Sequence, residues 1–164
     1  MKIYIGNDHG GYEAKCKVVK YLTEKGYEVI DEGSHNTQIV RYPYFAARVA
    51  KHVATESEAL GILICSTGIG MSIIANKFRG IRAALCTSSY MAKMTKRHNN
   101  SNILCLGGKT TDEFEIYDML DQWLEAEYEG GRHNISLGLI SETESEINSS
   151  ENFFLAQVEE KDQK

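Results

Sequence analysis

The sequence has little that would support a secreted, membrane-spanning or metal-binding protein. Its longest apolar run, 60–65, covers about six residues, whereas a membrane-spanning helix needs about 20. No apolar stretch follows the N-terminal Met1-Lys2, so we expect no signal peptide. The four cysteines form no CxxC pair and have no metal-like spacing to the five histidines. These absences predict a cytoplasmic protein with free thiols and no metal.

Most of the chain has no net charge. Residues 1–140 carry 16 acidic and 16 basic side chains, whereas 141–164 carry seven acidic and two basic ones. A neutral body lacks the basic face of a nucleic-acid-binding protein, so we expect no nucleic-acid partner. We expect one domain over 1–140 and an acidic tail over 141–164 that is partly helical or disordered. Docking of the Phe153-Phe154-Leu155 patch is the alternative for that tail.

Short apolar runs alternate with helical patterns along the body, which is typical of βα units built on a parallel sheet. Strands are expected at about 3–7, 27–31, 60–65, 80–86 and 102–106, and helices at about 10–25, 43–55, 68–78, 88–98 and 112–126. The uninterrupted apolar run at 60–65 indicates a central strand covered on both faces. This rhythm predicts an open, doubly wound α/β sheet of five parallel strands.

Ligands of such sheets bind at the carboxyl ends of the strands. The segment after the third strand is Cys65-Ser-Thr-Gly-Ile-Gly-Met-Ser72, a glycine-rich turn that leads into a helix. The backbone N–H groups of such a turn can hold a phosphate or stabilise an oxyanion. Cys65 lies at the positive end of that helix, which favours a thiolate, and Thr67 adds a hydroxyl. The alternative for Cys65 is a small buried hydrophobe, which is also how we interpret Cys16, Cys86 and Cys105.

Three other segments hold candidate polar groups. His9 follows Asp8 at the end of the first strand, where the pair could contact an anion and a hydroxyl or form an ordinary surface loop. His98-Asn99 ends a helix whose last turns are basic, which a simple helix cap also explains. Arg132 follows two glycines and has the planar fork that suits a phosphate. Familiar nucleotide motifs, GxGxxG and the P-loop, do not fit the glycines of this chain.

Several separated motifs together resemble the type B ribose-5-phosphate isomerases, whose wider family includes galactose-6-phosphate isomerases. The matching motifs are Asp8-His9, Tyr42-Pro43, Ile64-Cys65-x-Thr67-Gly68-x-Gly70-x-Ser72, Asn76-Lys77, Gly80-Ile81-Arg82, His98-Asn99 and Glu129-Gly130-Gly131-Arg132-His133. The resemblance covers residues 1 to about 140. It implies a Rossmann-like, three-layer αβα sandwich and a homodimer with active sites shared between subunits, or a dimer of such dimers.

The resemblance also implies a reaction and the residues that perform it. The reaction is the interconversion of D-ribose 5-phosphate and D-ribulose 5-phosphate through a cis-enediolate, without metal or organic cofactor. Cys65 would be the base, Thr67 would assist proton transfer at the substrate oxygens, and His98 would open the furanose ring. By the same resemblance, Asp8 and Asn99 would bind sugar oxygens, and His9 and Arg132 would bind the phosphate. Tyr42 would line the site. The anion hole would be formed by the backbone of Ser66, Gly68, Ile69 and Gly70, and Ser72 of the same motif would also belong to the binding site.

The chain departs from the family pattern at three positions. Some relatives carry a glutamate base where this chain has Met71, so Cys65 is the only candidate base. Ser136 replaces a second phosphate-binding arginine, and we expect the unusual Arg41 to compensate. Two alternatives stay open: a six-carbon substrate such as allose or galactose 6-phosphate, and a non-catalytic module that binds sugar phosphates.

Overall fold

The computed structural model describes residues 1–149, with a compact unit over residues 1–130 and a second unit that begins at Gly131. The elements of the first unit are β1 (Lys2–Asn7), the 3-10 turn η1 (His9–Gly11), α1 (Tyr12–Glu24), β2 (Glu28–Asp31), α2 (Tyr42–Thr55), β3 (Leu60–Cys65), α3 (Ile69–Ala75), β4 (Ala83–Leu85), α4 (Ser89–Asn99), β5 (Ile103–Gly107) and α5 (Glu113–Glu125). The second unit holds α6 (His133–Ser149).

The five strands form one parallel sheet in the order β2-β1-β3-β5-β4. β3 lies at the centre, and all six of its residues are buried, as its uninterrupted apolar sequence predicted. In the register between β1 and β3, Asn7 pairs with Ile64, so the two strands end side by side. The predicted five-stranded parallel α/β sheet is therefore confirmed.

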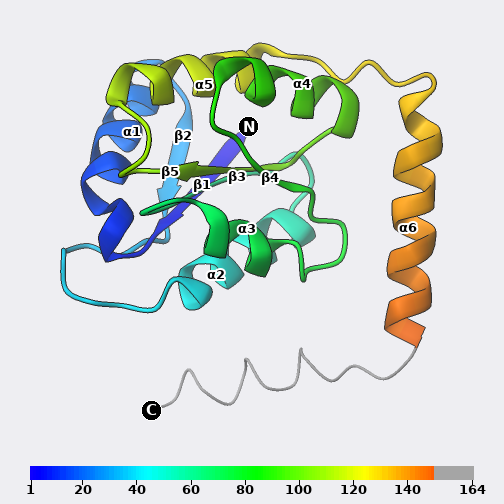
Figure 1. Cartoon of the computed structure of the whole chain (residues 1–164), viewed down its shortest axis with the longest axis horizontal. Helices are drawn as coiled ribbons and strands as arrows, with labels where there is room; N and C mark the ends of the chain where they lie inside the picture. The colour runs from blue at the N-terminus through cyan, green and yellow to red at the C-terminus, as the bar shows by residue number, and fades with distance from the viewer. Residues whose placement is uncertain (150–164) are drawn as a thin grey trace. The chain divides into compact units, whose positions relative to one another are not determined.

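Helices cover both faces of this sheet (Figure 1). One core cluster contains side chains of α1, α4 and α5, with the fully buried Trp123 as its largest member. The other cluster contains side chains of α2 and α3 packed on the opposite face of β1, β3 and β5. This arrangement confirms the three-layer αβα sandwich that the family resemblance implied.

Three local differences from the predicted elements have visible causes. α3 ends at Ala75 instead of 78, because the Asn76 side chain bonds the Ser72 carbonyl at 3.0 Å and both backbone groups of Ala83 at 2.8 and 2.9 Å. These bonds fix the start of β4, which is shorter than expected. The first helix is preceded by η1, because the Asp8 carboxylate caps the amides of Gly10 and Gly11 at 2.9 and 3.2 Å.

Helix α6 was not predicted as an element, and it continues through residue 140, where we expected the domain to end. Its first half contains Asn134, Ser136 and Gly138, which are weak helix formers and disguise the helical pattern. The hydroxyls of Ser141, Thr143 and Ser145 each donate to the carbonyl four residues earlier. The first part of the expected acidic tail is therefore helical, whereas the Phe153-Phe154-Leu155 patch lies outside the described residues.

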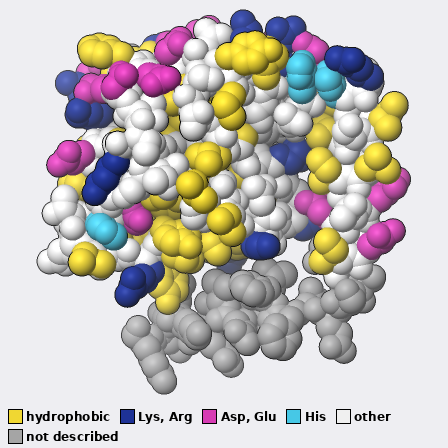
Figure 2. Space-filling view, viewed as in Figure 1, with side chains coloured by type: hydrophobic (Ala, Val, Ile, Leu, Met, Phe, Trp, Pro, Cys, Tyr) yellow, Lys and Arg dark blue, Asp and Glu magenta, His cyan; other side chains and the backbone are white. Residues whose placement is uncertain are grey.

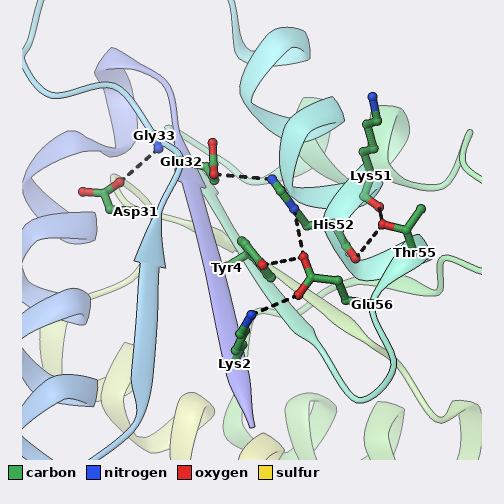
Figure 3. Close-up of polar contacts among 9 residues, drawn as sticks. All are labelled: Lys2, Tyr4, Asp31, Glu32, Gly33, Lys51, His52, Thr55 and Glu56. Atoms are coloured by element: carbon green, nitrogen blue, oxygen red, sulfur yellow. Dashed lines mark hydrogen bonds and ion pairs between the residues drawn. The ribbon is translucent and has the colours of Figure 1, made fainter.

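A cluster of polar side chains joins α2 to the first two strands (Figure 3). The His52 ring stacks on Tyr4 with centroids 4.3 Å apart, and its nitrogens lie 3.1 Å from Glu56 and 3.4 Å from Glu32. The Tyr4 hydroxyl donates to Glu56 at 2.5 Å. This bond holds the pKa of the Glu56 carboxyl below its usual value and, with burial, raises the pKa of Tyr4 to about 12. The cluster therefore stabilises the fold while Glu56 is ionised.

We expect Glu56→Gln to lower Tm by a few degrees at pH 7 and by progressively less as the solution is acidified. A carboxyl whose pKa is lowered by folding stabilises the protein above its unfolded pKa, about 4.3, and loses this contribution as pH falls through the folded pKa. Thermal unfolding of both proteins between pH 7 and pH 3 checks this. Glu24→Gln, at an exposed pair on α1 with a 3.9 Å contact to Lys20, is the control and should leave Tm unchanged. A Glu56→Gln deficit that stays constant with pH would contradict the prediction.

Candidate active site

The loops that follow β1, β3 and β5 meet at the carboxyl edge of the sheet. The Gly108 amide donates to the Cys65 carbonyl at 2.8 Å, and the Lys109 amide donates to the Ser66 carbonyl at 3.1 Å. A Cβ on Gly11 would run into the Ile64 backbone, so η1 packs directly against the end of β3. The predicted segments around Asp8, Ser66 and Lys109 thus form one continuous surface, as the rule for open α/β sheets led us to expect.

Cys65 is the last residue of β3, and its sulfur faces the turn that follows. The Gly68 amide donates to the Cys65 Sγ at 3.0 Å, and the thiol side chain is buried with 6% of the residue exposed. The Ile69 amide points to the Thr67 hydroxyl at 3.4 Å. Thr67 itself is exposed to solvent. A sulfur with a backbone donor and a neighbouring exposed hydroxyl is suited to moving a proton on a molecule bound at this edge.

Gly68 is needed for this turn because its φ is +76°, a conformation that side chains with a Cβ adopt at a cost. A Cβ here would also lie 2.7 Å from Leu85 and 2.9 Å from the backbone carbon of Leu106. The turn is therefore packed against Leu85 of β4 and Leu106 of β5, and this packing aims the Gly68 amide at the sulfur.

Tyr42 lies over the same turn, although it begins a different helix. A Cβ on Gly70 would lie 2.7 Å from two carbons of the Tyr42 ring, so the ring and the glycine backbone are in close contact. Tyr42 is 36% exposed, which leaves part of the ring at the surface. The structure thus brings Tyr42 and Gly70 together. The Ser72 hydroxyl, by contrast, donates to the Ile69 carbonyl at 2.8 Å within α3.

His9 connects the first loop to the segment before α2. Its Nδ1 lies 3.2 Å from the Val40 carbonyl oxygen and accepts the Val40 amide at 3.3 Å. This contact places residues 40–42 beside the Asp8-His9 loop. Asp8 uses one carboxylate oxygen as the cap of η1, and it is 8% exposed.

His98 and Asn99 lie at the opposite edge of the sheet from Cys65. α4 begins after the carboxyl end of β4 and ends before the amino end of β5, so its last turn is at the amino edge. Its 11 residues correspond to about 16 Å of helix. One chain therefore does not bring these two residues to the predicted base. Arg132 belongs to the unit that begins at Gly131.

Glu129 begins the motif that ends at His133, and no role was expected of it from the sequence. In the structure its carboxylate forms an ion pair with Arg97 and lies 3.6 Å from the Nε2 of His98. No short-range pattern could have shown this, since Glu129 is 31 residues from His98 in sequence.

The other cysteines of the chain have different surroundings. Burial raises the pKa of the Cys86 thiol to about 11 and raises that of Cys105 further above its ordinary range. Both are packed in the core as small hydrophobes, which agrees with their interpretation from the sequence. The same interpretation was wrong for Cys16, which is exposed on α1 because the buried face of that helix carries Lys15, Val18 and Leu22. A cavity of about 120 Å³ between α1 and α5, bordered by Lys17, Gly108 and Glu113, contains none of the predicted site residues.

The fold is an open α/β sheet with a cysteine at the carboxyl end of its central strand, the edge at which proteins of this class bind small molecules. Residues 3–140 match the sequence model of the family described as Ribose/Galactose Isomerase. The chain belongs to this family. Among residues 1–149, no helix combines the length and apolar character that crossing a bilayer requires.

Individual relatives agree with this assignment. The chain is 43% identical to ribose-5-phosphate isomerase B of Escherichia coli, over 90% of this chain and 99% of that protein. It is 49% identical to the solved structure of ribose-5-phosphate isomerase B from Clostridium thermocellum, with a TM-score of 0.87 and coverage of 90% and 99%. The Mycoplasma genitalium ribose-5-phosphate isomerase B, solved with bound ribulose-5-phosphate, is 37% identical with a TM-score of 0.85 and coverage of 88% and 97%.

Proposed function

We propose that this protein is an aldose–ketose isomerase that interconverts D-ribose 5-phosphate and D-ribulose 5-phosphate. The observation that carries the proposal is the buried Cys65 sulfur with its Gly68 donor at the carboxyl edge of β3, in a chain 43% identical to an E. coli ribose-5-phosphate isomerase B. The fold of a relative solved with ribulose-5-phosphate supports the same product. We also propose a cytoplasmic location. All four cysteines are free thiols, which is typical of proteins in a reducing compartment.

In this proposal Cys65 acts as the base on the open-chain sugar. Its thiolate takes the proton from C2 of the aldose, the C2–H electron pair forms the enediolate, and the resulting thiol returns the proton to C1. The Thr67 hydroxyl assists the transfer of the remaining proton from O2 to O1. The other family positions named above, including the amides of 66–70 and Arg132, are proposed to bind the sugar and its phosphate. Arg41, which precedes α2, stays a candidate for the missing arginine at Ser136.

The test is to incubate the purified protein with ribose 5-phosphate and follow ketose formation. Because the family description also names galactose, allose 6-phosphate and galactose 6-phosphate belong in the same assay. We expect kcat/KM to be highest for ribose 5-phosphate. A higher value for a six-carbon phosphate would replace the proposed substrate, and binding without conversion of any of them would indicate a non-catalytic module.

We further propose that the active site is completed by a second copy of the chain in a homodimer. The proposal is supported by the separation of His98 and Cys65 at opposite edges of one sheet, which only another chain could bridge. Large apolar side chains are also exposed on the first unit, including Tyr42, Ile69, Ile73, Tyr90 and Met91. Figure 2 shows hydrophobic side chains gathered on the face that carries α3 and the start of α4, a surface that suits a partner protein.

Mixing two inactive variants tests the shared site. Cys65→Ala and His98→Ala are each expected to be inactive, since each removes one required group from every site. In heterodimers formed by mild unfolding and refolding of an equal mixture, one site receives both defects and the other neither. Random pairing gives heterodimers in half of the molecules, so we expect activity to recover to about a quarter of the wild-type value. If the refolded mixture recovers no activity, both residues act within one chain.

A further inference from the structure

We propose that Glu129 is a positioning residue for His98 and serves the opening of the sugar ring. This inference rests on the proposed isomerase function. It assigns a role to a carboxylate that contacts the imidazole and is distant from the base at Cys65.

Three contacts hold Glu129 against the last turn of α4. Its backbone amide donates to the Arg97 carbonyl at 3.0 Å. One carboxylate oxygen pairs with the Arg97 guanidinium, and the other lies 3.6 Å from Nε2 of His98. The amide contact anchors the backbone, and the guanidinium holds one oxygen of the carboxylate. The second oxygen is thereby directed at the imidazole.

The partial exposure of this group suits a role in orientation. The side chains of His98 and Glu129 are 37% and 35% exposed, so the ring is accessible to a bound molecule while one edge meets the carboxylate. At 3.6 Å the Glu129 carboxylate is within ion-pair distance of the Nε2 of His98, where its charge favours one orientation of the imidazole.

Ring opening can be separated chemically from the proton transfer at carbon. Opening the furanose breaks the C1–O4 bond, forms the C1 carbonyl, and requires one proton to leave the C1 hydroxyl and one to reach O4. His98 supplies the proton to O4, water takes the hydroxyl proton, and the imidazole is reprotonated by solvent. Ribulose 5-phosphate needs no such step, because its C5 oxygen carries the phosphate and closure through O4 would give a four-membered ring.

The experiment therefore follows two reactions of each variant. The first is net conversion of ribose 5-phosphate, which includes ring opening. The second is the incorporation of deuterium from D₂O at C1 of ribulose 5-phosphate, observed by NMR, which needs only enolisation of the bound ketose. For Glu129→Gln we expect kcat for net conversion to fall about 10- to 100-fold, as for a misplaced catalytic group, while deuterium incorporation stays within about twofold of wild type.

The matched control is Glu113→Gln. Glu113 lies on α5, is 38% exposed, and pairs with Lys17 of α1 at 2.6 Å. Its substitution therefore reports the effect of losing an ordinary ion pair. It should leave both reactions unchanged. Glu129→Asp keeps the charge with a shorter side chain. We expect it to lower kcat for net conversion less than Glu129→Gln does, and to leave deuterium incorporation near the wild-type rate. This second variant also provides the test if Glu129→Gln does not fold.

Two results would overturn the role of Glu129: both reactions retained, or both lost in parallel in a folded variant. In the first case the carboxylate is dispensable, and in the second it acts on proton transfer or on the fold as a whole. Failure of the proposed function would look different, because the wild-type protein would then neither convert ribose 5-phosphate nor label ribulose 5-phosphate.

Discussion

Replacing Cys65 with alanine is expected to lower kcat for ribose 5-phosphate by at least about 100-fold, the lower end of what general-base catalysis contributes. The substitution removes the sulfur that the Gly68 amide contacts at 3.0 Å and leaves no group at the end of β3 that can take the C2 proton. KM should change little, because the thiol is proposed to act on the carbon-bound proton. Steady-state kinetics and the loss of deuterium incorporation into ribulose 5-phosphate are the measurements.

The other buried cysteine near the sheet edge is the matched control. Cys86 is also buried, and burial raises its pKa to about 11, so at neutral pH it is a protonated thiol in the core. Cys86→Ala is expected to lower Tm slightly and to leave kcat unchanged. If Cys65→Ala retained more than about a tenth of the wild-type kcat, the cysteine would not be the base, and the proposed mechanism would be wrong.

The second large effect is expected at Gly68, where alanine should lower both stability and turnover. At φ +76° an L-residue costs about 1–2 kcal/mol, and the added Cβ would lie 2.9 Å from the Leu106 backbone. The turn must then shift, which moves the amide away from the Cys65 sulfur. We expect kcat to fall about 10- to 100-fold, since small displacements of catalytic groups have such effects, together with a lower Tm.

Gly26→Ala separates backbone strain from the displaced turn. Gly26 has φ +87° but no neighbouring atom within 4 Å of an added Cβ, and it lies between α1 and β2, away from the carboxyl edge. Its alanine variant should lose stability by the conformational cost alone and keep full turnover. Equal kinetic behaviour of the two variants would show that the packing of the Gly68 turn has no influence on catalysis.

Local sequence patterns were sufficient to predict the sheet and the helices of residues 1–130, although they missed α6. The apolar run at 60–65 became the central strand with the predicted bounds, since a strand covered on both faces buries all six of its residues. The helices expected from about 88 and 112 begin beside Ser88 and Asp112, whose side chains accept the amides of Met91 and Glu115 as N-caps. The order of the motifs carried the family resemblance, which a match over residues 3–140 bears out.

The relations between distant segments depended on the path of the chain. Nothing local places the Gly70 backbone under the Tyr42 ring, or Glu129 beside His98, because these contacts arise only when separate βα units pack side by side. The same packing directs α4 toward the amino edge and so separates His98 from Cys65, two residues that the motifs assign to one reaction. Residue types and spacings therefore determine most of the strands and helices of residues 1–130 and the chemical groups that they carry. Which groups meet is decided by long-range packing, since the side chains concerned are far apart in sequence and no periodic pattern links them.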